Sequence, residues 1–511
     1  MDQDSYPELS NRYEDFGWPA TIVFSPEGNE IVKRRGYIPP DRMANLLDAI
    51  IKDPTPGPSV VAQTDVKPSG SAFLNEDQRK YLEDMHLALY DKENGGWGKG
   101  NRLIFSDEME FALVKAQSGD KKRESIARQT LDLALNLLDP VWGGFYQYSE
   151  SKDWKGPHFE KIISIQTQHM RLYALASEYL KKPEYLSAAE KTADYLKNFL
   201  TSPDGAFYTS QDADVSVEFD GHKFYPLSDA DRRKVEMPRI DQHIYARENG
   251  WAISALTTLY SVTSDEKYLK QAEHAAQWII EHRSLPGGGF RHDEKDLAGP
   301  FLGDTLYMAQ AFLNLYEISG NRAWLAVAVG AARFIDKNFT DKQGGGFKTI
   351  LTAGKTGVFQ KAVKQLDENI AIARFAMRLF YYTGNKKFKE MAEHAMKYAT
   401  SPDIIKNRPF ISGILLADYE LSAEPVHVTV VGKKEDPKAK DLFHSALRYP
   451  ANFRRVEWWD KKEGDLPNAD VSYPELPKAA AFACAGTTCS FPVFEPEKIA
   501  DQVNRARNSA V

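Results

Sequence analysis

Four side chains in the first half of the chain could exchange protons with a substrate. His158 and Glu160 lie in "PHFEK", where Pro157 is typical of a helix's first turn and would place both side chains near its amino end. Asp212 and Asp214 lie two positions apart in "QDAD", so in an extended loop they would point the same way. Such groups can act as general acid and base, or bind a sugar or cation. The alternative is structural: a histidine tied to a loop carbonyl and aspartates that cap backbone amides.

Three predicted helices begin with polar residues that could bind hydroxyl groups. These residues are Glu248 and Asn249 in "ENGWAISALTTLY", Asp304 and Tyr307 in "DTLYMAQAFLNLY", and Asp367, Glu368 and Asn369 in "DENIAIARFAMRLF". Polar residues at the starts of apolar helices are also ordinary caps. If the three helices open into one cavity, Glu248, Asn249, Asp304, Tyr307 and Asn369 would form a substrate-binding ring. His243 in "DQHIYAREN" is a weaker candidate.

Aromatic and basic residues offer further substrate contacts. Trp97, Lys99 and Arg102 in "GGWGKGNRLIF" could contact an anionic or hydroxylated substrate, and Trp154 could stack on a sugar ring. We therefore expect Trp97, Arg102 and Trp154 to join the binding ring.

The chain has two cysteines, Cys484 and Cys489, five positions apart at the end of a predicted strand. A dithiol, half of a metal site, and two packing thiols that could join under oxidation all fit this spacing. With no other cysteine and no histidine nearby in sequence, a tetrahedral zinc site lacks ligands. No phosphate loop and no GxGxxG after a strand occurs, so we predict neither metal nor cofactor.

Internal repeats predict the elements that would position these side chains. "KPEYLSAAEKTADYL", "DEKYLKQAEHAAQWI", "NRAWLAVAVGAARFI" and "NKKFKEMAEHAMKYA" each have an aromatic residue, an alanine four positions later and a second aromatic ten positions after the first. This spacing puts all three on one helical face. A glycine–aromatic element, such as "GGF" at 143–145, 288–290 and 345–347, recurs between the helices. Irregular repeat spacing favours a closed ring over a solenoid, so we predict an (α/α)6 toroid of about twelve helices over residues 73–423.

Composition divides the rest of the chain into three parts. Residues 1–52 predict a strand pair at about 20–36 followed by a helix. The Pro-, Gly- and Ser-rich residues 53–72 predict a linker. Residues 424–511 predict a small α/β unit, because "VHVTVVG" and "KAAAFACAG" are typical of buried strands with a helix between them.

Several motifs together resemble one family. "GGFYQYSESKDWKGPHFEK", "GAFYTSQDAD", "ENGWAISAL", "FLGDTLYMAQAFLNLYE", "LDENIAIA" and "CAGTTCSFP" are similar to the YyaL-like, spermatogenesis-associated family, in which a thioredoxin-like domain precedes a six-hairpin toroid. The resemblance covers nearly the whole chain. That toroid is similar to the one in N-acylglucosamine 2-epimerase and related sugar enzymes, which implies a carbohydrate-type cavity.

The resemblance also interprets the amino-terminal segment. "GWPATIVF" looks like the strand that follows the thioredoxin cis-proline, while the half with the motif cysteines is missing. We therefore expect an amino-terminally truncated thioredoxin-like segment that cannot perform dithiol chemistry. "GGWGKGNRLIF" and "EKIISIQTQHM" depart from the family pattern, and the latter lacks its aspartate–asparagine pair.

Composition narrows the function classes. The formal net charge is −7, hydrophobic residues are 42% and charged residues 27%, with no basic stripe and no apolar run of eighteen residues. These features argue against nucleic-acid and membrane partners, and the acidic start "MDQDSYPELS" is no signal peptide, so we expect a cytoplasmic protein. The leading hypothesis is a carbohydrate epimerase or isomerase rather than a hydrolase, acting on a small carbohydrate. The alternative is a non-catalytic toroid that binds a glycan or a protein. The incomplete amino-terminal sheet further predicts self-association.

Overall fold

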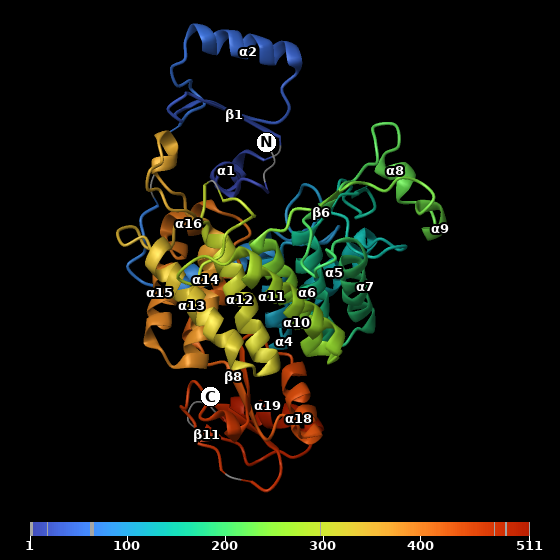
Figure 1. The fold of residues 1–511 in the computed structure, drawn as a ribbon, viewed down its shortest axis with the longest axis vertical. Helices are drawn as coiled ribbons and strands as arrows, with labels where there is room; N and C mark the ends of the chain where they lie inside the picture. The colour runs from blue at the N-terminus through green and yellow to red at the C-terminus, as the bar shows by residue number, and fades with distance from the viewer. Residues whose placement is uncertain are drawn as a thin grey trace.

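The computed structural model describes residues 4–17, 19–61, 66–296, 298–474, 476–485 and 488–509. Three parts follow one another along the long axis of the molecule: an amino-terminal segment, a ring of helices, and a small carboxy-terminal unit (Figure 1). The ring therefore has one end toward each of the other parts.

Six inner helices close the ring. Each packs against the next, and the last returns to the first. In order they are α4 (Ser106–Gln117), α6 (Ile163–Leu180), α10 (Ala246–Thr263), α12 (Leu302–Ser319), α14 (Leu366–Thr383) and α17 (Gly413–Ser422). The closure confirms the predicted (α/α)6 toroid.

Six outer helices surround them, and each packs most extensively against one inner helix. They are α3 (Glu76–Ala88), which pairs with α17, and α5 (Lys121–Ala134), α7 (Pro183–Phe199), α11 (Glu266–Arg283), α13 (Arg322–Phe339) and α15 (Lys386–Ala399), which pair with the inner helix before them. Inner helices are more buried than outer ones: the inner helix α12 buries 14 of its 18 residues, whereas the outer helix α13 buries six of 18. The repeated alanines Ala189, Ala272, Ala328 and Ala392 are fully buried, as the repeat predicts.

Short turns join inner to outer helices. Gly320 ends α12 with φ 64°, a left-handed conformation that glycine adopts without strain, and the side chain of Asn321 then caps α13. Gly384 and Asn385 do the same between α14 and α15.

Short strands and a long insertion decorate the ring. The strands are β3 (Tyr148–Ser149), β4 (Pro157–His158), β5 (Lys161–Ile162), β6 (Ser210–Gln211) and β7 (Ile240–Asp241), and the insertion adds helices α8 (Gly221–Phe224) and α9 (Asp229–Arg232). The expectation that Pro157 starts a helix is wrong. Pro157 and His158 pair antiparallel with Ser149 and Tyr148, and the helix begins six residues later, at Ile163.

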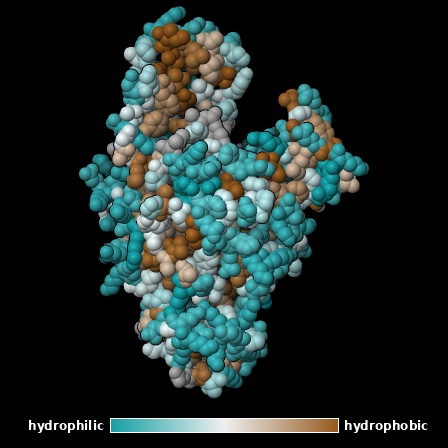
Figure 2. Space-filling view, viewed as in Figure 1, coloured by the Kyte–Doolittle hydropathy of each residue, from teal (hydrophilic) through white to brown (hydrophobic). Residues whose placement is uncertain are grey.

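The amino-terminal segment lies against the open end of the ring. It contains α1 (Pro7–Tyr13), the antiparallel pair β1 (Ala20–Phe24) and β2 (Glu30–Arg35), and α2 (Pro40–Lys52). No residue of α2 is buried, and hydrophobic residues gather over this segment at the top of Figure 2. Within the expected linker, residues 66–72 lie along α15, where Ser69 N donates to Lys397 O over 2.8 Å.

The carboxy-terminal unit covers the other end of the ring. The helix α16 (Pro402–Asn407) belongs to the ring, and the unit itself contains β8 (Val426–Val431), α18 (Pro437–Arg448), β9 (Arg454–Trp459), β10 (Ala480–Ala485), β11 (Thr488–Cys489) and α19 (Ile499–Ser509). The sheet order is β11-β10-β8-β9, with only β8 and β9 parallel among these described strands. Between the unit and the inner helices lies a cavity of about 90 Å³ that Arg454 enters, 2.8 Å from Glu317.

Short 3₁₀ turns complete the chain: Glu14–Phe16, Leu135–Leu137, Gly357–Gln360, Lys461–Glu463 and Pro496–Lys498. Among the described residues, no helix is both long and apolar enough to cross a bilayer.

Candidate functional site at the mouth of the ring

Ionisable side chains gather where the inner helices begin, at the end of the ring that faces the amino-terminal segment. We call this end the mouth and define the mouth cluster as Asp107, Arg247, Glu248, His292, Asp304, Tyr307, Asp367 and Glu368. All but His292 come from the first turn or two of α4, α10, α12 and α14. Carboxylates are favoured there by the positive end of each helix dipole.

His292 contacts one side of this cluster through Asp304. Its Nδ1 is 2.9 Å from Asp304 Oδ1, and its Nε2 is 2.7 Å from the backbone carbonyl oxygen of Asp4. Both partners accept, so both ring nitrogens carry a proton. Burial lowers the pKa of His292, but the charge of Asp304 and its hydrogen bond outweigh that effect and raise the pKa to about 9. The ring is therefore an imidazolium at neutral pH.

Arg247 and Glu248 form the neighbouring ion pair. Arg247 donates from two nitrogens to Glu248 Oε1, at 3.0 and 2.6 Å, and its backbone N–H donates to Asp304 Oδ1 over 3.0 Å. The second carboxylate oxygen of Glu248 is buried and makes no hydrogen bond in the structure. Ligating atoms of Glu248, His292 and Asp304 lie within 4.8 Å of one another. The His292 imidazolium, which can act as a general acid, thus lies close to the Glu248 carboxylate, one of whose oxygens makes no hydrogen bond.

Three further carboxyl groups hold raised pKa values. Burial raises the pKa of Glu368 to about 8 and, with the charge of Asp367, that of Asp107 to about 7. Burial also raises the pKa of Asp367, whose side chain still contacts solvent. Gly303 makes this crowding possible, because a Cβ there would lie 2.9 Å from Glu368 Oε1. Shifts of this kind in facing groups are typical of acid–base sites.

Aromatic rings flank the cluster. Arg247 lies 4.9 Å from the ring of Trp251, which meets Tyr307 edge-on at 5.2 Å. Both rings are partly accessible, so they offer a flat face next to the charged groups.

The four residues predicted to be catalytic lie in the loops beside the long insertion. We call His158, Glu160, Asp212 and Asp214 the rim residues. His158 stacks on Tyr148, and its Nε2 is 3.8 Å from Glu160 Oε2. Burial, Asp212 and Asp4 raise the pKa of Glu160, so Glu160 and the mouth cluster share a neighbour in Asp4.

The two aspartates of "QDAD" have separate partners. Asp212 pairs with Arg239 at 3.1 Å on an exposed surface. Asp214 accepts from the backbone N–H of Gly221 over 2.7 Å, as in the structural alternative. His243, the weaker candidate, pairs with Asp241 at 2.6 Å and stacks on Tyr245.

Two of the predicted hydroxyl binders make hydrogen bonds that join inner helices to loops. Asn249 accepts from the N–H of Phe207 over 2.8 Å and donates to its carbonyl over 3.1 Å. Asn369 does the same with Phe347, at 2.7 and 3.1 Å. Both side chains are fully buried. Gln166 bonds Phe145 in the same way, and Thr305 accepts from the N–H of Phe290, so inner helices repeatedly fasten a glycine–aromatic loop.

The aromatic and basic candidates are also internal. Trp97 donates to the carbonyl of His86 over 2.9 Å, and Trp154 donates to that of Asn94 over 2.8 Å. Arg102 pairs with Asp91 at 2.5 Å. All three side chains are at most 2% exposed, so their contacts support packing and give no support to substrate binding.

The amino-terminal segment covers the mouth. Besides the Asp4 contact, Gln365 donates to the carbonyl of Asn11 over 2.6 Å, and Lys355 pairs with Glu8 at 3.2 Å. Arg12 donates to the carbonyl of Lys361 over 2.7 Å. In this arrangement α1 closes the entrance to the cluster.

A metal ion does not fit the mouth cluster as it is folded. Glu248, His292 and Asp304 have the spacing of a ligand set. However, both His292 nitrogens act as donors, so neither has a lone pair to give to a cation.

Sequence reasoning missed His292 and Arg247 entirely. His292 follows the aromatic of "GGF" by two positions, where the corresponding loops have Lys99, Gln147, Thr209 and Thr349. Because one of these residues is also ionisable, the repeated position does not single out His292.

Comparison with known proteins agrees with this architecture. The chain is 22% identical to human spermatogenesis-associated protein 20 over 80% of the chain, and spans 66% of that protein's length. It is 19% identical to an uncharacterized Caenorhabditis elegans protein, over 99% of the chain and 87% of the relative. No family profile matches.

Solved structures share the ring. D-mannose isomerase superposes with a TM-score of 0.52 at 12% identity, covering 68% of this chain and 96% of that one. A sugar epimerase from a ruminal bacterium gives 0.50 at 13% identity, covering 63% and 85%. At such identities the likeness shows the fold alone. The chain is thus similar in sequence to spermatogenesis-associated protein 20, and its core is a six-hairpin (α/α)6 toroid.

Proposed function

We propose that the protein binds a carbohydrate at the mouth of the toroid and epimerises or isomerises it by proton transfer. The observation that carries the proposal is His292, an imidazolium held by Asp304 within 4.8 Å of the Glu248 carboxylate. Toroids of the same fold include an enzyme described as a D-mannose isomerase and one described as a sugar epimerase.

The chemistry assigns a role to each group. Epimerisation or isomerisation beside a sugar carbonyl removes a proton from carbon while a second group donates to the carbonyl oxygen. In this proposal the unsatisfied oxygen of Glu248 accepts the carbon-bound proton and His292 donates to the carbonyl oxygen. Arg247 stabilises the negative charge that develops, and Trp251 stacks on the sugar ring.

Substrate binding requires α1 to move. His292 Nε2 donates its hydrogen bond to the carbonyl oxygen of Asp4. In the proposal, a substrate oxygen accepts that hydrogen bond in place of Asp4. An incoming sugar replaces that carbonyl and displaces the segment ahead of α1. In the open form, the rim residues His158, Glu160 and Asp212 then contact the distal hydroxyl groups of the substrate.

Proton exchange in D2O tests the proposal. A panel of aldoses, ketoses and N-acylated amino sugars is incubated with the protein, and deuterium incorporation beside the carbonyl is followed by NMR. His292→Gln abolishes exchange, whereas His282→Gln, on the exposed face of α11, leaves it unchanged. If His158→Gln abolishes exchange while His292→Gln retains it, the chemistry belongs to the rim and the mouth assignment is wrong.

A second candidate function is binding without turnover. The closed mouth, with Asp4 already satisfying His292, favours it. A sugar that raises the melting temperature without any deuterium incorporation would support this candidate. A cytoplasmic location, and self-association through the two-stranded β1–β2 sheet, stay predictions.

A further inference from the structure

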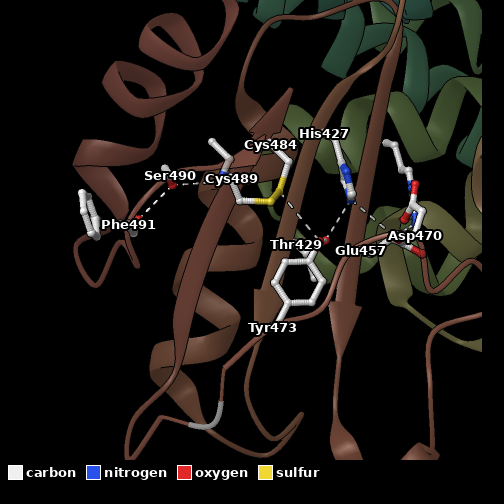
Figure 3. Close-up of a disulfide and its surroundings, with 11 residues drawn as sticks. His427, Thr429, Glu457, Asp470, Tyr473, Cys484, Cys489, Ser490 and Phe491 are labelled. Carbon is white, nitrogen blue, oxygen red and sulfur yellow. Dashed lines mark hydrogen bonds and ion pairs between the residues drawn. A yellow bond between two sulfur atoms is a disulfide. The ribbon is translucent and has the colours of Figure 1, made fainter. Parts of the chain in front are cut away.

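The two cysteines form a disulfide at one edge of the carboxy-terminal sheet. Cys484 in β10 and Cys489 in β11 are directly opposite each other in an antiparallel pair (Figure 3). The same row continues to His427 in β8 and Arg455 in β9. Residues in one row share a face of the sheet, so the disulfide and the imidazole are neighbours.

This face carries a chain of polar contacts that ends at a sulfur atom. The Tyr473 hydroxyl is 3.9 Å from Cys484 Sγ and 2.8 Å from Thr429 Oγ1. Thr429 Oγ1 is in turn 3.0 Å from His427 Nε2, which lies 3.6 Å from Glu457 (Figure 3). Hydroxyl and imidazole groups in contact can pass a proton along the chain.

The polar chain lies beneath a small apolar cover. Phe482 and Cys484 belong to a cluster separate from the main core, against which Tyr473 and Leu476 pack. Thr429 is fully buried and His427 is 7% exposed. A disulfide that served only to join two strands would need no buried polar path, because apolar neighbours would pack against it at less cost.

The two sulfurs differ in access. Cys484 is 5% exposed and contacts the polar chain, whereas Cys489 is partly accessible. Phe491, two residues beyond Cys489, is 90% exposed. A thiol from outside would therefore meet Cys489 first and find an apolar surface beside it.

We propose that Cys484–Cys489 is a thiol–disulfide exchange site for a cysteinyl thiol. Phe491 favours a peptide whose cysteine has an apolar neighbour over a free small thiol. This activity is separate from the mouth cluster, which lies at the opposite end of the ring.

The exchange balances in two steps. The incoming thiolate forms a bond with Cys489 Sγ while the Cys484–Cys489 bond breaks. Cys484 leaves with the electron pair and takes a proton relayed from His427 through Thr429 and Tyr473. For this transfer the Tyr473 hydroxyl, which donates to Thr429 in the structure, turns toward the sulfur, and His427 recovers its proton from water. A second substrate thiolate attacks the substrate sulfur of the mixed disulfide and releases Cys489 as a thiolate, which takes the second proton from water. Two substrate thiols become one disulfide, and the protein gains two electrons and two protons.

Trapping the mixed disulfide in the full chain tests the assignment. Cys484→Ser leaves Cys489 free, and Cys489→Ser leaves Cys484 free as the matched control. Each variant is incubated with oxidised glutathione, or with an activated disulfide of a cysteine peptide that carries a neighbouring leucine, and adducts are counted by mass spectrometry. We expect Cys484→Ser to react about tenfold faster than the control, and faster with the peptide than with glutathione. Faster reaction with glutathione would identify a small-thiol site and overturn the peptide assignment.

The proton path has its own test. The wild-type disulfide should be reduced by reduced glutathione while the helical circular dichroism signal is unchanged. Tyr473→Phe should slow that reduction about tenfold and change its pH dependence, which a packing role would not do. Equal trapping rates for the two cysteine variants, or a wild-type disulfide that glutathione cannot reduce in the folded protein, would overturn the proposal.

Discussion

His292 and Asp304 form a buried ion pair, 2.9 Å between Nδ1 and Oδ1, that joins the loop after a glycine–aromatic turn to the first turn of α12. Neither residue is more than about 2% exposed. The pair therefore couples the protonation of one side chain to both the stability of the ring and the chemistry proposed at its mouth.

The stability of the protein should depend on pH through His292. Its pKa is raised from 6.5 to about 9 in the folded state, so its stabilisation is complete below pH 6.5 and is lost as pH rises through 9. His292→Gln should thus cost about 3 kcal/mol of unfolding free energy at pH 6 and much less at pH 9.5. Urea titrations at both pH values measure this, and a cost independent of pH would show that the imidazole is neutral.

Replacing Glu368 should stabilise the protein in mild alkali. Burial raises the pKa of Glu368 from 4.5 to about 8, so folding favours its protonated form, and that stability is lost as pH rises through 8. Glu368→Gln mimics the protonated form and should be more stable than wild type by about 4 to 5 kcal/mol at pH 8.5. Below pH 4.5 the advantage should vanish. Thermal melts at pH 4 and 8.5 provide the comparison, with Glu393→Gln on α15 as control.

Asn249 should behave as a structural residue. Asn249→Ala leaves the backbone N–H and carbonyl of Phe207 buried without these partners, so we expect a loss of about 2 to 4 kcal/mol. Asn407→Ala, on an exposed position of α16, should change stability by less than about 0.5 kcal/mol. A stable Asn249→Ala variant that loses sugar binding would instead restore its predicted role in substrate binding.

Asp139 should hold the insertion against the ring. Its carboxylate accepts from Lys161 at 2.7 Å and from Arg232 at 2.7 and 3.0 Å, and all three groups are fully buried. Asp139→Asn leaves two buried cations without a counter-charge and should cost about 3 to 5 kcal/mol. Limited proteolysis should then cut within residues 211–247. The exposed Asp231→Asn variant serves as control, and equal proteolysis of the two variants would contradict this role.

The ring was predictable from the sequence because the repeated residues are those that pack between neighbouring helices. Alanine four residues after an aromatic is buried in every copy, since close approach of neighbouring helices leaves no room for a larger side chain. Glycine followed by asparagine at 320–321 and 384–385 likewise marks helix ends through local backbone geometry.

The site was harder to predict because polar residues at the starts of the inner helices either bind a loop or face the mouth. Asn249 and Glu248 are adjacent in sequence, yet one fastens a loop and the other faces the mouth. Helical rotation of about 100° per residue separates their roles, and a single sequence does not show which face is inward. His292 was missed because it lies in a loop, where no periodicity marks it.

The carboxy-terminal unit gives the ring a floor. Arg454 enters the small cavity between the unit and the inner helices and pairs with Glu317 of α12. Within the described residues this unit therefore covers the end of the ring opposite the mouth. Under the proposed function, substrate would enter and product would leave through the mouth alone. Retained product should then compete with fresh substrate, and a long polymer could present only its terminal residue.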